Sequence, residues 1–355
     1  MNLRRLRSLR KQKARHPSAE RGRRLRVESL EPRVMLDAEG ILLGTDVHLS
    51  LSFAPDGTDI AGQSNSLAAR FDAIAPRADW QETILRAFQT WAVETNSDIG
   101  VVADGGDQFG SPGPIQKDNR FGDIRIGAIE MSPEVGAVNV PVDGLVSGTW
   151  FADVVFNTAF SYQTLDDIYA VALHEAGNVF GLEDNLDPNS PLFDNGVLSA
   201  TGLPPTANDI AALQQLHGAR MPDNNEEYDD LTNNDSFANA TELDDAEVEG
   251  GVDGSAPSIV YGDISGSADQ DFFEIDLPDD YTGNVTIQVR SSGISLLAPE
   301  VTLYSYTQQL LQQSISTSKT GDLITLQFPA PDEYPFIKIA GAAPGLFGIG
   351  GYSLV

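Results

Sequence analysis

The chain of 355 residues contains no cysteine, only four histidines and no long apolar run. Without cysteine it can form no disulfide, no thiolate zinc site, no iron–sulfur cluster and no cysteine nucleophile. Any bound metal must therefore use histidine, carboxylate or amide ligands. Because no stretch of about 18 apolar residues occurs, the sequence predicts no transmembrane segment. The histidines are too scattered for two of them to share a helical turn, and they are His16, His48, His174 and His217.

Positive charge is scarce and lies mostly at one end of the chain. The sequence has 22 Lys and Arg against 52 Asp and Glu, a formal charge of -30. Residues 1–36 hold 12 of the basic residues and 3 acidic ones, a net charge of +9, which leaves -39 on the rest. A body of that charge repels nucleic acid, so we expect no nucleic-acid partner. A basic leader of this kind is typical of a disordered targeting arm.

The end of this leader carries a short motif. No apolar stretch of about 7–15 residues follows the charges, as a secretory signal would require. Instead, residues 30–38 read LEPRVMLDA, which resembles the LEPR-XLL box near the N-terminus of many large secreted or surface proteins of planctomycete bacteria. The resemblance implies export, so the expected location is extracellular or at the cell surface. We therefore predict that residues 1–38 are a basic, disordered export leader.

Residues 39–222 combine helical and strand patterns. Four apolar residues step by 4, 4 and 3, which predicts one buried helix face; they are Trp80, Ile84, Phe88 and Trp91. Short strands are predicted at 99–102 and 124–126, on either side of a loop over 104–122. A second helix is predicted from Leu165, ending at Gly181, because glycine favours the left-handed conformation at a helix C-terminus. A third begins near Thr206 with Asp209 as a capping-box variant.

The second predicted helix carries the most informative residues. Residues 174–184 read HEAGNVFGLED, which matches H-E-x-x-H-x-x-G-x-x-H of metzincin zinc peptidases at His174, Glu175 and Gly181. In that motif two imidazoles lie one helical turn apart, and the glycine lets the chain turn so that a third ligand completes the zinc site. Asn178 and Asp184 take the second and third ligand positions here.

The likeness extends to the matrixin family along much of this region. Further segments resemble the family's strands, its approach to the zinc helix, and the turn and helix that follow; they are residues 122–126, 148–157, 167–175, 187–193 and 208–218. The resemblance implies a metzincin-like α+β domain, with a twisted mixed sheet plus three helices, that acts on protein or peptide substrates. It also implies zinc held by His174, Asn178 and Asp184, with Glu175 as the general base.

Two departures from the family pattern lie at positions that form the zinc site. Asn178 offers an amide oxygen, a weaker zinc donor than imidazole, and Leu192 replaces the methionine whose turn lies beneath the zinc. His217 is a conceivable substitute ligand, but a packed or solvent-facing histidine at a helix end is the favoured interpretation. Two functions therefore stay open: a secreted zinc endopeptidase, or a non-catalytic pseudoenzyme that binds partners at the cell surface through the peptidase fold and the sandwich.

The remaining chain predicts an acidic linker at 223–232 and an all-β region at 233–355. Apolar residues alternate in five short runs, which predict an antiparallel sandwich; the runs are 273–277, 285–289, 301–303, 324–328 and 337–339. Segments 234–241, 262–273 and 351–354 resemble the bacterial pre-peptidase C-terminal domain. That resemblance implies a jelly-roll-like sandwich that binds an extracellular matrix polymer or calcium. The candidate calcium ligands are Asp263, Asp269 and Asp271, with solvated turn carboxylates as the alternative.

Overall fold

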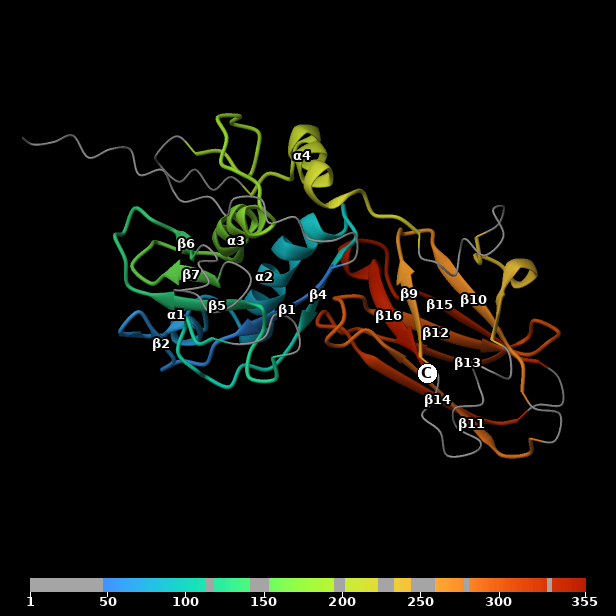
Figure 1. The fold of residues 1–355 in the computed structure, drawn as a ribbon. Helices are drawn as coiled ribbons and strands as arrows, with labels where there is room; N and C mark the ends of the chain where they lie inside the picture. The colour runs from blue at the N-terminus through green and yellow to red at the C-terminus, as the bar shows by residue number, and fades with distance from the viewer. Residues whose placement is uncertain are drawn as a thin grey trace, which may run out of the picture. The chain divides into compact units, whose positions relative to one another are not determined.

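The computed structural model describes residues 47–112, 118–140, 153–194, 202–222, 233–243, 259–277, 281–330 and 334–355. The predicted leader at 1–38 and linker at 223–232 lie outside these ranges, and the predicted domain boundaries stay predictions. The described residues belong to one compact unit, Leu36–Val355. It is a mixed α+β structure with several sheets, in which strands outnumber helices (Figure 1).

The first sheet has the strand order β4-β1-β5-β7-β6. Its strands are β1 (Val47–Phe53), β4 (Ser97–Val101), β5 (Ile124–Ile129), β6 (Ala137–Val140) and β7 (Asp153–Asn157). All pairings are parallel except that of β6 with β7. Every residue of β5 and β7 is buried, as expected for parallel strands covered on both faces. A small hairpin, β2 (Asp59–Ile60) with β3 (Gln63–Ser64), precedes the helices.

The described residues of this part of the chain form four α-helices: α1 (Leu67–Phe71), α2 (Arg77–Ala92), α3 (Leu165–Val179) and α4 (Ala207–His217). The predicted apolar face of α2 is confirmed, because Trp80, Ile84, Phe88 and Trp91 are all buried in one core. Helices α2 and α3 pack side by side (Figure 1), and Trp91 Nε1 donates to the Leu173 carbonyl at 2.9 Å. The core of this sheet therefore fixes the orientation of α3, which carries the predicted site.

The ends of α3 and α4 are set by local signals. The predicted capping box at the start of α4 is confirmed, since Thr206 and Asp209 each accept from the other's main-chain N–H. Thr164 and Asp167 form the same box at the start of α3. Such boxes satisfy N–H groups that have no partner within the helix. None of the helices in the described ranges is both long and apolar enough to cross a bilayer.

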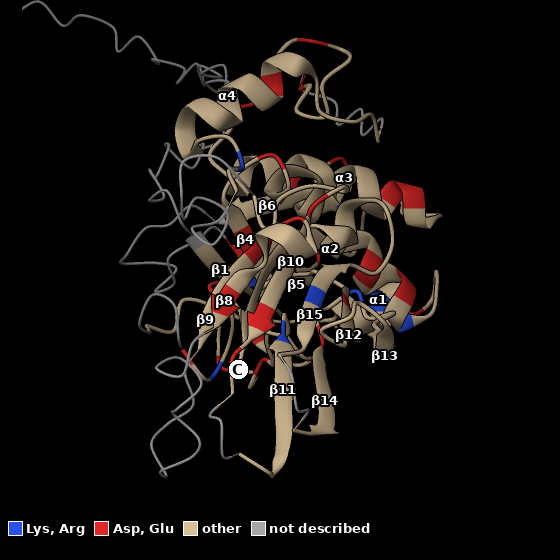
Figure 2. Ribbon diagram, turned by 90° about the vertical axis from the view of Figure 1, so that its right-hand side faces the viewer, with Lys and Arg blue, Asp and Glu red and all other residues tan. Residues whose placement is uncertain are grey.

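The C-terminal part consists of two facing sheets, ordered β13-β12-β15-β10-β8 and β14-β11-β16-β9. The strands are β8 (Thr241–Leu243), β9 (Val260–Ile264), β10 (Gln270–Ile275), β11 (Asn284–Arg290), β12 (Pro299–Tyr304), β13 (Leu310–Ile315), β14 (Leu323–Pro329), β15 (Phe336–Gly341) and β16 (Gly350–Leu354). Residues of both sheets share one core. Four of the predicted alternating runs lie entirely on strands, and the run 273–277 extends past the end of β10 at Ile275. Among the described strands of these two sheets, β8 alone pairs in parallel, with β10. Asp and Glu recur on the helices and strands, whereas Lys and Arg are sparse (Figure 2).

Candidate functional site

The three predicted ligand residues meet at the C-terminal end of α3. His174 and Asn178 lie one helical turn apart, and Asp184 returns to them from the following loop. His174 Nε2 is 3.1 Å from Asp184 Oδ1. The amide Nδ2 of Asn178 is 3.4 Å from His174 Nε2 and 3.3 Å from Asp184 Oδ1. Three atoms therefore form a small triangle: His174 Nε2, Asn178 Nδ2 and Asp184 Oδ1.

The return of Asp184 depends on the way α3 ends. Gly181 has a φ of +87°, a conformation that glycine adopts without strain. Its N–H donates to the Asn178 carbonyl at 2.9 Å, and the Leu182 N–H donates to the Gly177 carbonyl at 3.0 Å. This pair of bonds is the Schellman arrangement of helix C-termini. It confirms the predicted role of Gly181 and reverses the chain so that Asp184 faces α3.

A second loop segment, which carries Pro191 and Leu192, packs against α3. His174 Nδ1 lies 3.1 Å from the Pro191 carbonyl oxygen, and the adjacent Leu192 is buried. A Cβ on Gly177 would lie 2.7 Å from Leu192 Cδ2 and 2.9 Å from Trp91 Cζ2. Leu192, which the sequence places at the methionine position of the turn, thus packs directly against α3.

Asn185 stabilises the conformation of this loop, a role that the sequence did not predict. Its N–H donates to the Leu192 carbonyl at 2.9 Å. Its side-chain amide donates to Ser190 Oγ at 3.0 Å and to Asp209 Oδ1 at 3.1 Å. The segment that carries Pro191 and Leu192 is therefore tied to α4.

Glu175 is buried beside the triangle, with an exposed fraction of 1%. Its Oε2 accepts a hydrogen bond from Asn139 Nδ2 of β6 at 2.9 Å. Its Oε1 is buried and has no hydrogen-bond partner within the described residues. Burial raises the pKa of this carboxyl to about 7; the charge of Asp184 acts in the same direction and that of His174 against it. Glu175 can therefore exist in both protonation states near neutral pH.

His174 is held in a setting that favours its protonated form in the absence of metal. Burial lowers the pKa of the imidazole, but the hydrogen bond to Asp184, the charges of Glu175 and Asp184 and the Pro191 carbonyl outweigh it and raise the pKa to about 9. Both ring nitrogens face oxygen acceptors, so an imidazolium can donate to each. Metal binding at Nε2 requires the loss of that proton.

The triangle fits a zinc ion in size. Tetrahedral zinc with bonds of about 2.0–2.1 Å has ligand atoms roughly 3.3–3.4 Å apart, close to the spacings of 3.1, 3.3 and 3.4 Å found here. No three His, Asp or Glu side chains gather around a metal position in the described ranges, so such a site must include the Asn178 amide. Asn178 Oδ1 is buried without a partner, and rotating the amide would exchange it with Nδ2.

His217 has a packing role in the described structure. Its Nε2 lies 2.7 Å from the Phe180 carbonyl oxygen at the end of α3, and its ring meets the Phe180 ring edge-on. Burial lowers the pKa of this imidazole. The contact joins the last turn of α4 to the end of α3, in line with the packed-histidine interpretation.

The candidate calcium ligands of the C-terminal sheets already accept hydrogen bonds from protein donors. Asp263 Oδ1 accepts from Arg220 Nε at 3.0 Å. Asp269 Oδ2 accepts from the N–H and hydroxyl of Ser265, and the buried Asp271 accepts from the Tyr352 hydroxyl. Calcium binding at these residues stays a prediction.

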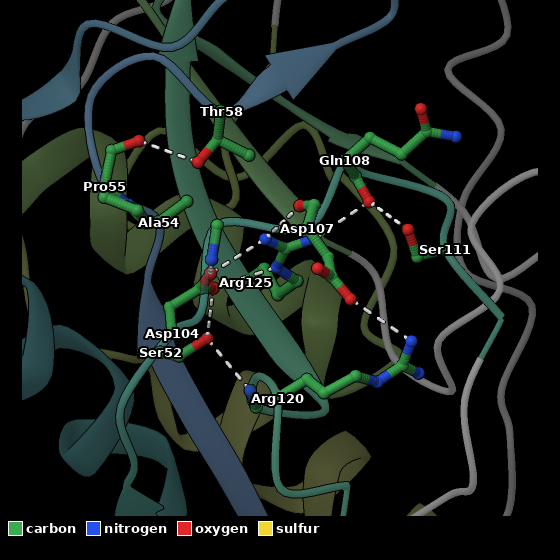
Figure 3. A network of polar contacts seen from close by, with 12 residues as sticks. Ser52, Ala54, Pro55, Thr58, Asp104, Asp107, Gln108, Ser111, Arg120 and Arg125 are labelled. Carbon is green, nitrogen blue, oxygen red and sulfur yellow. Dashed lines mark hydrogen bonds and ion pairs between the residues drawn. The ribbon is translucent and has the colours of Figure 1, made fainter.

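A second buried charged cluster lies on β5, around Arg125 (Figure 3). The side chains of Arg125 and Asp104 are fully buried, and Nε and Nη2 of the guanidinium each donate to one Asp104 oxygen at 2.9 Å. Nη2 and Nη1 also donate to the main-chain carbonyls of Asp107 and Gln108, at 2.7 and 3.1 Å. The guanidinium also lies 4.4 Å from the ring centres of Phe109 and Phe121. The sequence pattern predicts a strand at Arg125, but it does not predict this cluster.

Comparisons with known proteins show no family. No protein-family model matches the chain, and no curated protein matches it. Among solved structures, the pre-peptidase C-terminal domain of a collagenase from Bacillus anthracis is similar, with 13% identity and a TM-score of 0.20, over 27% of this chain and 85% of that chain. A TM-score of this size carries no argument about function.

Proposed function

We propose that the chain is an extracellular zinc-dependent peptide hydrolase of the matrixin type, with a C-terminal sandwich of the pre-peptidase C-terminal kind. The observation that carries the proposal is the convergence of His174, Asn178 and Asp184 within 3.1–3.4 Å of one another. These residues would hold zinc, which supplies Lewis-acid activation of a water molecule and of the peptide carbonyl.

Glu175 supplies the proton chemistry in this proposal. Its Oε2 is occupied by Asn139, whereas Oε1 has no partner within the described residues. Oε1 can therefore accept a proton from the attacking water and return it to the leaving nitrogen of the peptide. Pro191 fixes the orientation of the His174 ring through Nδ1, which directs Nε2 toward the metal position.

A second candidate function has its own supporting observation. Without metal, His174 and Asp184 bond each other and the Asn178 amide donates to Asp184. A cluster that holds itself together in this way does not need zinc for its shape. The alternative is therefore a non-catalytic surface protein that binds a protein or an extracellular matrix polymer.

One experiment separates the two functions. The full chain is purified without chelator, its zinc content is measured, and cleavage of casein is compared with that of Glu175→Gln. We expect stoichiometric zinc in both proteins and a loss of about 10²–10⁴-fold in cleavage rate for Glu175→Gln, the usual contribution of a general base.

The exposed Glu183, in the same motif, provides the matched control, and Glu183→Gln should leave cleavage unchanged. Zinc without cleavage in the parent chain would favour the binding function. Absence of zinc after dialysis against micromolar zinc would reject the metal site itself.

A further inference from the structure

Asn139 is the residue through which the first sheet touches the general base. It lies on β6, where it pairs with Val154 of β7. Its Nδ2 donates to Glu175 Oε2 at 2.9 Å and to the Glu175 main-chain oxygen at 3.2 Å. Asn139 therefore joins the edge strand to both the side chain and the backbone of one residue of α3.

These two contacts fix the orientation of the Asn139 amide. Both partners on Glu175 are oxygen acceptors, so the NH2 group must face them. Rotating the amide would place Oδ1 against two oxygens and leave the NH2 group without these acceptors. Oδ1 therefore points away from Glu175, where it is buried and has no donor within the described residues.

Two other asparagines of the same sheet region show what a purely structural amide does here. Asn157 donates to the Ser132 and Val135 carbonyls and accepts from the Met131 and Ala159 N–H groups. Asn65 likewise donates twice and accepts twice. Both amides are fully satisfied, as buried polar groups usually are. Asn139 differs because its acceptor Oδ1 has no donor within the described residues, as is also true of Glu175 Oε1.

We propose that Asn139 is a positioning residue for Glu175 and a contact for the bound peptide. This inference rests on the proposed peptidase function. Asn139 holds the carboxylate through Oε2, so that Oε1 is the oxygen that receives the proton of water. Its Oδ1 accepts a hydrogen bond from an N–H group of the peptide substrate. No bond to Asn139 forms or breaks: water adds to the carbonyl carbon, the C–N bond breaks, and the proton carried by Oε1 passes to the leaving nitrogen.

The first test measures the contact without relying on activity. Thermal unfolding is compared for the parent chain, Asn139→Ala, Glu175→Ala and the double variant. Asn139→Ala should lower the Tm by about 3–6 °C when Glu175 is present, because a buried carboxylate loses its donor. It should lower the Tm clearly less in the Glu175→Ala background. Equal shifts in both backgrounds overturn the proposal.

The second test measures catalysis with a fluorogenic peptide, and it uses Asn139→Asp as a variant of the same shape that lacks the donor. Both Asn139→Asp and Asn139→Ala should lower kcat by about 10²-fold through misplacement of Glu175, with zinc content unchanged. Asn139→Ala should also raise KM more than Asn139→Asp does, because only the alanine variant loses the acceptor. Val138→Ala, on the opposite face of β6 in a separate apolar cluster, is the control and should leave kcat unchanged.

The outcomes separate this inference from the function on which it rests. An active parent chain whose Asn139→Asp variant keeps the parent kcat overturns the role of Asn139 alone. A parent chain that holds no zinc or cleaves no peptide overturns the proposed function, and with it the catalytic role of Asn139.

Discussion

The Arg125 cluster and the cluster on α3 are both buried and charged, but they differ in how completely their polar atoms are paired. Around Arg125, the guanidinium meets two carboxylate oxygens and two carbonyls, and the Asp104 oxygens accept further bonds from Ser52 and Gly106. In the cluster at α3, acceptor oxygens stay open on Glu175 and Asn178 of the helix and on Asn139 of the neighbouring strand β6. Full pairing indicates a structural role, whereas open buried acceptors indicate a place for a ligand.

The largest effect is expected when the fully paired cluster is broken. Arg125→Met leaves the Asp104 carboxylate buried without its cation, with only the bonds from Ser52 and Gly106, which should cost about 3–5 kcal/mol of unfolding free energy. The control is Arg120→Met, because Arg120 pairs with Asp107 and Asp118 from a side chain that is 40% exposed. That substitution should cost at most about 1 kcal/mol. Chemical denaturation measures both changes in unfolding free energy.

Similar costs for the two arginine variants would contradict the comparison. The Arg125 cluster would then be no more structural than a surface ion pair, and full pairing would lose its value as a marker. Zinc content should be unchanged in both variants, because neither arginine contacts the triangle on α3.

A smaller effect is expected from the packing beneath α3. Alanine normally stabilises the interior of a helix by about 1 kcal/mol relative to glycine. Gly177→Ala should instead destabilise the protein by about 1–3 kcal/mol, because the new methyl group would press on Leu192 and Trp91. In the Leu192→Ala background, which removes one of these contacts, Gly177→Ala should cost less than it does in the parent chain, as measured by denaturation. A Gly177→Ala protein that is more stable than the parent would mean that the loop carrying Leu192 can shift to accommodate the new methyl group.

The smallest effect is expected from a change to the triangle on α3. Asn178→His replaces an amide oxygen by imidazole nitrogen one turn from His174, and it should raise zinc affinity by about 10–100-fold, the range over which ligand surroundings alter metal sites. Isothermal titration with zinc measures the change. The same substitution at Asn185, which holds the loop, should give no gain. An unchanged affinity in Asn178→His would show that the triangle is not a metal site.

The sequence predicted those features whose cause is local. The helix face of α2, the capping box at Thr206 and the turn at Gly181 each depend on residues a few positions apart. The approach of Asp184 to His174 follows from that turn. The alternating apolar runs likewise predicted strands of the C-terminal sheets.

What the sequence did not predict are contacts between distant segments. Asn139 and Glu175 are 36 positions apart, and Arg125 and Asp104 are 21 apart. No periodicity connects such pairs, because the tertiary fold brings them together: Asn139 of β6 meets Glu175 of α3, and Arg125 of β5 meets Asp104 of the loop after β4. The same holds for Asp263, whose partner Arg220 lies 43 positions away in the sequence.

The position of β6 has a consequence for motion. Within the described residues β6 has four residues and pairs with β7 alone, whereas β1 and β5 have neighbours on both sides. A short strand with a single neighbour opens at a lower free energy than the centre of its sheet. Since Asn139 travels with β6, each such opening releases the Glu175 carboxylate while the rest of the sheet stays folded. The fraction of molecules in which Asn139 holds the Glu175 carboxylate should therefore fall on warming before global unfolding begins.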